Sequence, residues 1–193
     1  VRFHPDWHAL LTLLRGQGWM ARPFAERRPG RWAAAAAGML LHGQVEAGTL
    51  CPATMTQAAI PVLRRDPALW AWLGERLLDA RHDPSDQPID AKPSIWLGMG
   101  MTEKQGGSDV RANTTKAYPI GAEEGPGAAY ELVGHKFFVS APMCDVFLVL
   151  AQAPGGPVAV LVPRFRPDGS ALFEMRAHDV EEFVGVVERY GTT

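Results

Sequence analysis

The sequence predicts a multidomain α+β protein, in which an N-terminal helical domain precedes a small, antiparallel, β-barrel-like middle domain. Apolar residues recur at helical spacing before residue 80, and short apolar runs separated by turn residues fill the chain after residue 94. Between them lies a stretch rich in Asp, Pro and Ser. The expected domains are a partial helical domain at 1–93, a middle β domain at 94–176 and a divergent tail at 177–193.

Four helices are expected in the N-terminal domain. Asp6 should cap the first, and the Gly16–Gln17–Gly18 stretch should end it. Pro61 should bend or break the third helix, because proline lacks an amide proton and clashes with the preceding turn. The later helices are expected at about 29–48, 52–65 and 67–80.

The segment 81–93 has the composition of a linker or an exposed loop. After it, residues 95–97 form a short apolar strand. Two hairpins are then expected: one around Gly134–His135, with strands at 130–133 and 137–139, and one around 154–156, with strands at 146–151 and 158–162. Antiparallel pairing is expected because a parallel crossover needs a dozen or more residues.

The composition narrows the possible functions. Hydrophobic residues make up 47% of the 193 residues, and the net charge of −2 gives the chain no overall basic field for nucleic acid. The small arginine clusters at 27–31 and 64–65 are therefore interpreted as solvated helix ends. The longest apolar run is too short for a membrane span, and no secretory signal is recognisable.

No metal site is expected. The two cysteines, Cys51 and Cys144, have neither metal-binding nor redox spacing and suit a reducing, cytoplasmic environment. His42 and His135 lack His, Cys or carboxylate partners at ligand spacing, so both are interpreted as satisfied or exposed histidines.

The chemistry is concentrated in Gly98–Asp109, which contains four glycines together with Thr102 and Ser108. Glycine lets the backbone approach a ligand closely, and successive amide groups in such turns favour an anion such as a pyrophosphate. Two common motifs are excluded. A G-x-G-x-x-G dinucleotide motif would need glycine where Glu103 stands, and a P-loop would need a lysine after its second glycine. An ordinary glycine-rich loop remains the alternative.

Two motifs give a family resemblance. Residues 101–110, MTEKQGGSDV, closely resemble the T-E-x-x-x-G-S-D motif of acyl-CoA dehydrogenases, and residues 134–140, GHKFFVS, resemble a second motif of that family. Their order and spacing also match. The stretch 43–52, together with 98–110, is similar to the AidB-type branch linked to the alkylation response. The resemblance runs from about residue 2 to about residue 176.

The resemblance implies FAD bound against the middle domain, through the loop after its first strand. It places Met99, Met101 and Thr102 along the flavin, with Thr102 donating a hydrogen bond to the ring. It places Gly107 and Ser108 at the ribityl-pyrophosphate or the neighbouring acyl-CoA. Phe138 would stand where the family often has a Trp beside the flavin, and Ser140 near the reactive nitrogen. The implied cofactor-binding set is Met99, Met101, Thr102, Gly107, Ser108, Phe138 and Ser140.

Simpler structural interpretations stay open for these residues. Met99 and Met101, two positions apart, also fit a buried strand face, and Phe137 or Phe138 alone also fits a core position. Glu103 and Asp109 are interpreted as structural, because loop carboxylates commonly accept backbone N–H bonds. No catalytic residue is assigned.

The chain departs from the family after Arg176. The family's L-x-D-K-L-G-x-R-like run has no match, and apolar residues from Val180 to Val187 would suit an amphipathic helix. We expect the C-terminal four-helix bundle, which supplies the catalytic Glu and much of the homotetramer interface in the family, to be absent.

The expected function is an FAD-dependent oxidoreductase acting on the CH–CH group of acyl-CoA, inactive as this chain alone. The first alternative is an AidB-type flavoprotein with a protective role against alkylation, whose DNA association would come from the missing C-terminal region. The second is a chain with no stable fold.

Overall fold

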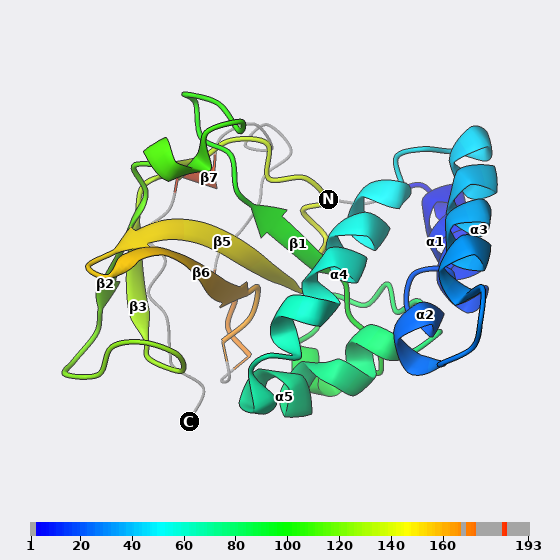
Figure 1. The fold of residues 1–193 in the computed structure, drawn as a ribbon, viewed down its shortest axis with the longest axis horizontal. Coiled ribbons are helices and arrows are strands. Elements are labelled where there is room, and N and C mark those ends of the chain that lie inside the picture. The colour runs from blue at the N-terminus through cyan, green and yellow to red at the C-terminus, as the bar shows by residue number, and fades with distance from the viewer. Residues whose placement is uncertain (1–2, 167–168, 173–182, 185–193) are drawn as a thin grey trace. The chain divides into compact units, whose positions relative to one another are not determined.

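A computed structural model describes residues 3–166, 169–172 and 183–184. The chain divides into two structural units between Leu97 and Gly98. Helices make up the regular structure of the first unit and a β-sheet dominates the second, so the predicted mixed α+β class is confirmed (Figure 1). Within the described residues, no helix has both the length and the apolar character to cross a membrane.

Five α-helices and one short 3-10 helix form the helical unit. Their bounds are α1 Pro5–Gly16, α2 Arg22–Ala25, α3 Arg31–Val45, α4 Leu50–Leu63, α5 Pro67–Leu78 and η1 Ile89–Ala91. The sequence analysis missed α2, which is only four residues long and starts with proline in its first turn. The core includes buried residues from α1, α4 and α5, among them Leu11, Ile60 and Leu73.

The helix ends follow local chemistry, with one correction. Asp6 does not cap α1. The cap is His4, whose ring Nδ1 accepts a hydrogen bond from the Asp6 amide at 3.2 Å. Gly18, with φ +73°, follows the end of α1 as expected of a left-handed C-terminal residue. Asp66 caps α5 by accepting from the amides of Ala68 and Leu69.

Pro61 does not break α4, contrary to the possibility of a break. It is exposed and lies in the last turn, so the helix loses only the single hydrogen bond that its amide would have donated. The Arg64 amide still bonds the Ile60 carbonyl at 3.1 Å and completes the turn.

Residues 81–93 form an irregular, mostly exposed segment, as expected of a loop, but the segment is anchored to the helices and is not a free linker. Ile89 and Lys92 are buried, and the Trp96 side chain is 2% exposed. Arg15 of α1 holds both ends of the segment, since its guanidinium donates to the carbonyls of Asp79 and Ile95 at 2.7 Å each. The Asp- and Pro-rich composition therefore describes an irregular segment packed on the helices.

The second unit contains a five-stranded sheet and a two-stranded one. The strands of the larger sheet are β1 Leu97–Gly100, β2 Lys116–Pro119, β3 Tyr130–Val133, β5 Val146–Ala153 and β6 Gly156–Pro163. Their order is β1-β5-β2-β3, with β6 also paired to β5 (Figure 1). The smaller sheet pairs β4, His135–Lys136, with β7, Phe183–Val184.

Strand pairing confirms one expected hairpin and corrects the other. β5 and β6 form a long antiparallel hairpin, with Val146 opposite Pro163 and Ala153 opposite Gly156. β3 instead pairs with β2, which the sequence analysis did not predict, while β4 turns away to pair with β7. The chain bends at Gly134, where a side chain would collide with the backbone of Thr115.

Two further expectations need correction. β2 and β5 pair in parallel, with Lys116 opposite Gln152, so the sheet is not wholly antiparallel. The chain between them is long enough for such a crossover because it includes β3 and β4. In the tail, Phe183–Val184 is a strand and not part of a helix. The rest of the expected tail helix lies outside the described residues.

Candidate functional site

The first part of the glycine-rich stretch belongs to a strand. β1 runs to Gly100, so the turn that can meet a ligand begins at Met101. Gly98 has a packing role: a Cβ there would lie 2.4 Å from a ring carbon of Phe147 on β5. The glycine therefore lets β1 lie against an aromatic side chain, and its role is not close approach to a ligand.

Two segments far apart in the sequence lie side by side at this turn. The amide of Phe137 donates to the carbonyl of Thr102 at 2.9 Å. A Cβ on Gly100 would lie 3.7 Å from the Lys136 side chain and 3.9 Å from that of Val139. The structure thus brings together the two motif segments, 101–109 and 134–140.

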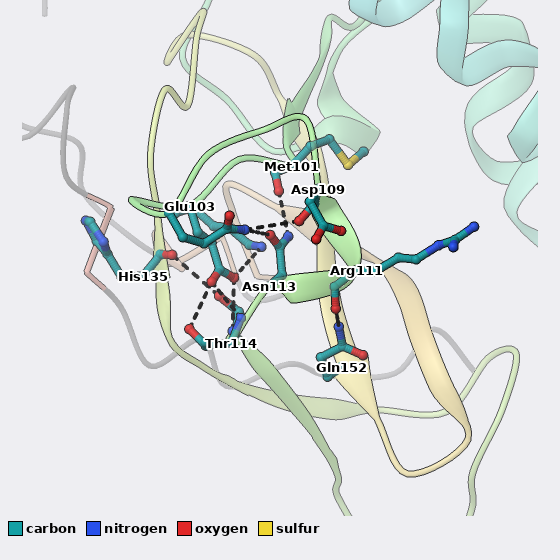
Figure 2. A network of polar contacts seen from close by, with 11 residues as sticks. Met101, Glu103, Asp109, Arg111, Asn113, Thr114, His135 and Gln152 are labelled. Carbon is teal, nitrogen blue, oxygen red and sulfur yellow. Dashed lines mark hydrogen bonds and ion pairs between the residues drawn. The ribbon is translucent and has the colours of Figure 1, made fainter.

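Glu103 is the centre of the polar network below the turn. Its carboxylate accepts hydrogen bonds from the Thr114 amide at 2.6 Å, the Thr115 amide at 2.9 Å and the Thr114 hydroxyl at 2.9 Å. It also forms an ion pair with the Lys136 ammonium at 2.9 Å. Figure 2 shows the Glu103 carboxylate directed into this network, while the Met101 side chain points away from it. The structural role predicted for Glu103 is confirmed.

Burial and hydrogen bonding act against each other on Glu103. Its side chain is 4% exposed, and burial by itself would raise its pKa. The hydrogen bonds from Thr114, Thr115 and Lys136 outweigh burial and lower the pKa to about 2. Glu103 is therefore an anion at neutral pH with its oxygens already bonded, which makes it unsuited to general acid–base work.

A second link fixes the turn from its other side. The side-chain amide of Asn113 donates to the Met101 carbonyl at 2.7 Å and accepts from Gln105 at 3.1 Å. Gln105 also donates to the carbonyl of Asp109 at 3.2 Å. The Asp109 carboxylate does not cap the short helix η2, Val110–Ala112, that follows it. The turn is thus closed by side-chain amides.

The predicted residues of the first motif differ in exposure, and two of them lie close together. Met99, Met101 and Thr102 are half-buried, while Gly107 and Ser108 are exposed. A Cβ on Gly107 would lie 2.9 Å from the Thr102 hydroxyl oxygen, so only glycine leaves that hydroxyl clear. Among the residues that the structure describes, the hydroxyls of Thr102, Ser108 and Ser140 have no hydrogen-bond partner within the chain.

The second motif supplies an exposed ring on a strained backbone. Phe138 is 65% exposed and has φ +57°, a conformation that is rare for a bulky residue. Its ring stands edge-on to that of Phe137, with the centroids 4.2 Å apart. Ala141 also has a positive φ, +56°. Such strain persists where the surrounding structure fixes it, and it is commonest at binding sites.

The histidines singled out in the sequence differ in environment. His42 is buried and its ring lies 2.8 Å from the Thr49 hydroxyl, which confirms a satisfied histidine. Nε2 of His135 is buried without a partner in the described part of the chain. Across those same residues, no group of three or more His, Cys, Asp or Glu side chains is arranged to hold a metal ion.

Lys136 and Asn113 are among the residues of this site that the sequence analysis missed. Lys136 stood inside the second motif but was given no role, although a lysine directly before an apolar run, here residues 137–139, is a detectable signal for a buried ion pair. Asn113 carried no comparable signal, because its role depends on where the Met101 carbonyl lies in space.

Comparison with known proteins accounts for both units. Residues 1–84 match the model of the adaptive response protein AidB N-terminal domain, and residues 98–187 match that of the acyl-CoA dehydrogenase middle domain. The chain is 47% identical over 175 residues to AidB of Escherichia coli K12. That match covers 88% of this chain and 31% of the relative's length.

Solved structures show the same fold. The apo form of Bd2924 matches with a TM-score of 0.73 and 26% identity over 89% of this chain and 34% of its own. Caenorhabditis elegans ACDH-11, solved with C11-CoA, matches with a TM-score of 0.69 and 24% identity over 89% of this chain and 30% of its own. With both domain matches and the identity to AidB, the chain belongs to the acyl-CoA dehydrogenase family, in its AidB-type branch.

Proposed function

We propose that this chain forms the flavin-binding part of an AidB-type acyl-CoA dehydrogenase, with FAD held between the turn at 101–109 and the segment 137–140. The observation that carries the proposal is the hydrogen bond between the Phe137 amide and the Thr102 carbonyl, which holds the two segments together. The two segments also carry three hydroxyls without partners in the described chain and one exposed aromatic ring.

These groups fit an isoalloxazine ring. Hydroxyl donors on Thr102 and Ser140 suit the polar edge of the ring without placing a full charge beside it. The exposed face of Phe138 suits stacking, and as a phenylalanine it keeps the flat apolar surface of a tryptophan but lacks its N–H donor. Gly107 leaves the Thr102 hydroxyl accessible. The nearby charges of Glu103 and Lys136 compensate each other.

FAD, when bound, would accept the hydride that leaves an acyl-CoA thioester on dehydrogenation. The residues of this chain would orient the flavin through Thr102, Ser108 and Ser140 and cover it with Phe138. Among the described residues of the turn, Glu103 is fully engaged and so cannot act as the base that removes the α-proton. We therefore propose weak FAD binding and negligible dehydrogenase turnover by the 193-residue chain alone, with acyl-CoA as the substrate of the whole protein.

The test is purification with added FAD, followed by a visible absorption spectrum of the retained fraction. Thr102→Val should weaken FAD binding about tenfold, as expected for one lost hydrogen bond to the ligand. Thr12→Val is the matched control, because the Thr12 hydroxyl bonds only within α1 on an exposed face. Equal FAD affinity of the two variants, or no FAD affinity at all, would contradict the proposal.

A second function has support from the match of residues 1–84 to an adaptive response protein. In this alternative the flavoprotein protects against alkylation damage and associates with DNA as part of the whole protein. A binding titration with duplex DNA at several salt concentrations tests it, because phosphate contacts make affinity fall steeply with salt. No salt-dependent binding by the full-length relative would remove this alternative.

A further inference from the structure

We infer that the buried Glu103–Lys136 ion pair is a positioning device for flavin binding: it sets the distance between the Thr102 turn and the Phe138 segment. The inference rests on the proposed function for the identity of the ligand. In it, Glu103 and Lys136 are positioning residues that act through their neighbours, Thr102 and Phe137.

The pair lies directly beside the contact between the two segments. Glu103 follows Thr102 in the sequence, and Lys136 precedes Phe137. The ion pair and the Thr102–Phe137 backbone hydrogen bond are therefore neighbouring links between the same two segments. Two links in succession, at 2.9 Å each, fix orientation as well as distance, which a single link would not.

The same carboxylate ties both segments to the sheet. The Thr114 and Thr115 amides that bind Glu103 immediately precede β2, and β2 pairs with β3 over four positions. The Thr115 carbonyl in turn accepts from the Gln152 amide of β5 at 2.8 Å. Glu103 therefore fixes the positions of the turn and of Lys136 relative to the paired strands of the sheet.

Stability alone does not explain a pair of charges here. Glu103 and Lys136 are 4% and 2% exposed, and burial opposes the charged form of each. Replacing a buried ion pair by well-packed apolar side chains is commonly neutral or stabilising, because desolvation offsets the attraction. What an ion pair adds over an apolar contact is direction, and direction is what two ligand-binding segments need.

Lys136→Met tests the inference, with Lys92→Met as the matched control. Lys92 is also a buried lysine, 5% exposed, and its ammonium donates to the Ser85 carbonyl at 2.8 Å within the helical unit. Quenching of flavin fluorescence gives the FAD affinity of the folded proteins. We expect Lys136→Met to weaken FAD binding about tenfold or more, and Lys92→Met to bind FAD as the unmodified chain does.

Amide hydrogen exchange provides a readout that needs no flavin. The Phe137 amide should exchange at least about tenfold faster in Lys136→Met than in the unmodified chain, and at an unchanged rate in Lys92→Met. Slow Phe137 exchange in Lys136→Met overturns the inference, as does FAD affinity equal to that of the unmodified chain.

The two proposals fail separately in this design. If the unmodified chain binds no FAD, the proposed function fails, and the exchange rate of Phe137 alone decides whether the pair links the segments. If Lys136→Met loses its fold, Lys136→Arg replaces it: a retained charge should retain slow Phe137 exchange, and fast exchange there would count against the pair.

Discussion

Each of the two units has a buried charged side chain that binds backbone groups. The two charges are opposite in sign and have different structural roles. In the helical unit, Arg15 is 1% exposed, and its guanidinium donates to carbonyls at the C-terminal end of α5 and before β1. In the β unit, Glu103 accepts from amides before β2 and pairs with Lys136.

The difference shows how a structural charge is distinguished from a positioning charge. Carbonyls at a helix C-terminus lack intrahelical partners and carry partial negative charge, so Arg15 satisfies groups that α5 would otherwise leave open. Its ring neighbour Trp96, 4.6 Å away, adds a cation–π contact. Glu103 instead joins three segments through a counter-charge, and two of those segments carry the candidate ligand-binding groups.

The distribution of tryptophan lets the two units be followed separately. All six tryptophans lie between residues 7 and 96, so intrinsic tryptophan fluorescence reports on the helical unit. Far-UV circular dichroism and amide exchange at β2 and β5 report on the sheet. The stability of each unit can therefore be measured separately.

The largest effect is expected from Arg15→Met. The change removes the side-chain donor from the carbonyls of Asp79 and Ile95, and one of two donors from that of Arg76. It should lower the free energy of unfolding by about 3–5 kcal/mol. Urea unfolding followed by tryptophan fluorescence measures it. Arg81→Met is the control, because that side chain is 68% exposed and pairs with Asp79 at the surface. A loss below about 1 kcal/mol would show that Arg15 is not a structural centre.

Glu103→Gln should destabilise the β unit by about 3 kcal/mol, because it leaves the Lys136 ammonium buried without its counter-charge. Exchange of amides in β2 and β5 should accelerate, while the tryptophan transition changes less. The exposed Glu124→Gln provides the control. If the tryptophan transition changed more than amide exchange in the sheet, Glu103 and Arg15 would not stabilise separate units.

Acid should weaken the helical unit first. Burial, and then the positive charges of His8, Arg15 and Lys92, lower the pKa of His82 from 6.5 to about 4, with Asp83 acting in the opposite direction. The folded state therefore binds fewer protons than the unfolded state between these values. Its stability should be complete above pH 6.5 and fall as the pH drops towards 4, by about 3 kcal/mol at most.

The His82 dependence is checked by urea unfolding followed by tryptophan fluorescence at pH 7, 6, 5 and 4. Trp96 donates to Nδ1 of His82 at 3.0 Å, so that nitrogen must stay unprotonated for the bond to persist. His82→Gln should flatten the pH dependence of the free energy of unfolding, and substitution of the exposed His4 by Gln should leave that dependence unchanged. In the β unit, the pKa of Glu103 is lowered from 4.5 to about 2, so protonation of this group should reduce stability only below pH 4.5.

The smallest effects are expected at two glycines, one in each unit, where an aromatic ring leaves no room for a Cβ. Gly98→Ala places a Cβ 2.4 Å from the Phe147 ring and should cost about 1–3 kcal/mol. Gly38→Ala in α3 meets the Trp19 ring at the same distance, but alanine gains about 1 kcal/mol of helix propensity, so the net loss should be smaller. Gly155→Ala, with nothing within 4 Å, is the neutral reference for thermal unfolding.

Sequence reasoning reached the class of fold and the identity of the motif segments. Helical periodicity around Leu11 and Leu73 and the turn between β5 and β6 are local patterns, so the elements they predict are found in the structure. The expected hairpin at Gly134 was wrong. A glycine between two apolar runs indicates a bend, but it does not indicate with which strand each run pairs. β3 pairs with β2, which precedes it.

By itself, the sequence determined that a helical part precedes a β part, the family motifs and the structural role of Glu103. Only the tertiary structure decided that 79–97 packs on the helices, that Lys136 neutralises Glu103, and that Asn113 closes the turn. The physical reason is the range of the interactions. Periodicity, caps and turns act over a few residues, whereas a buried charge or a backbone carbonyl takes its partner from whichever segment the fold brings within hydrogen-bonding distance.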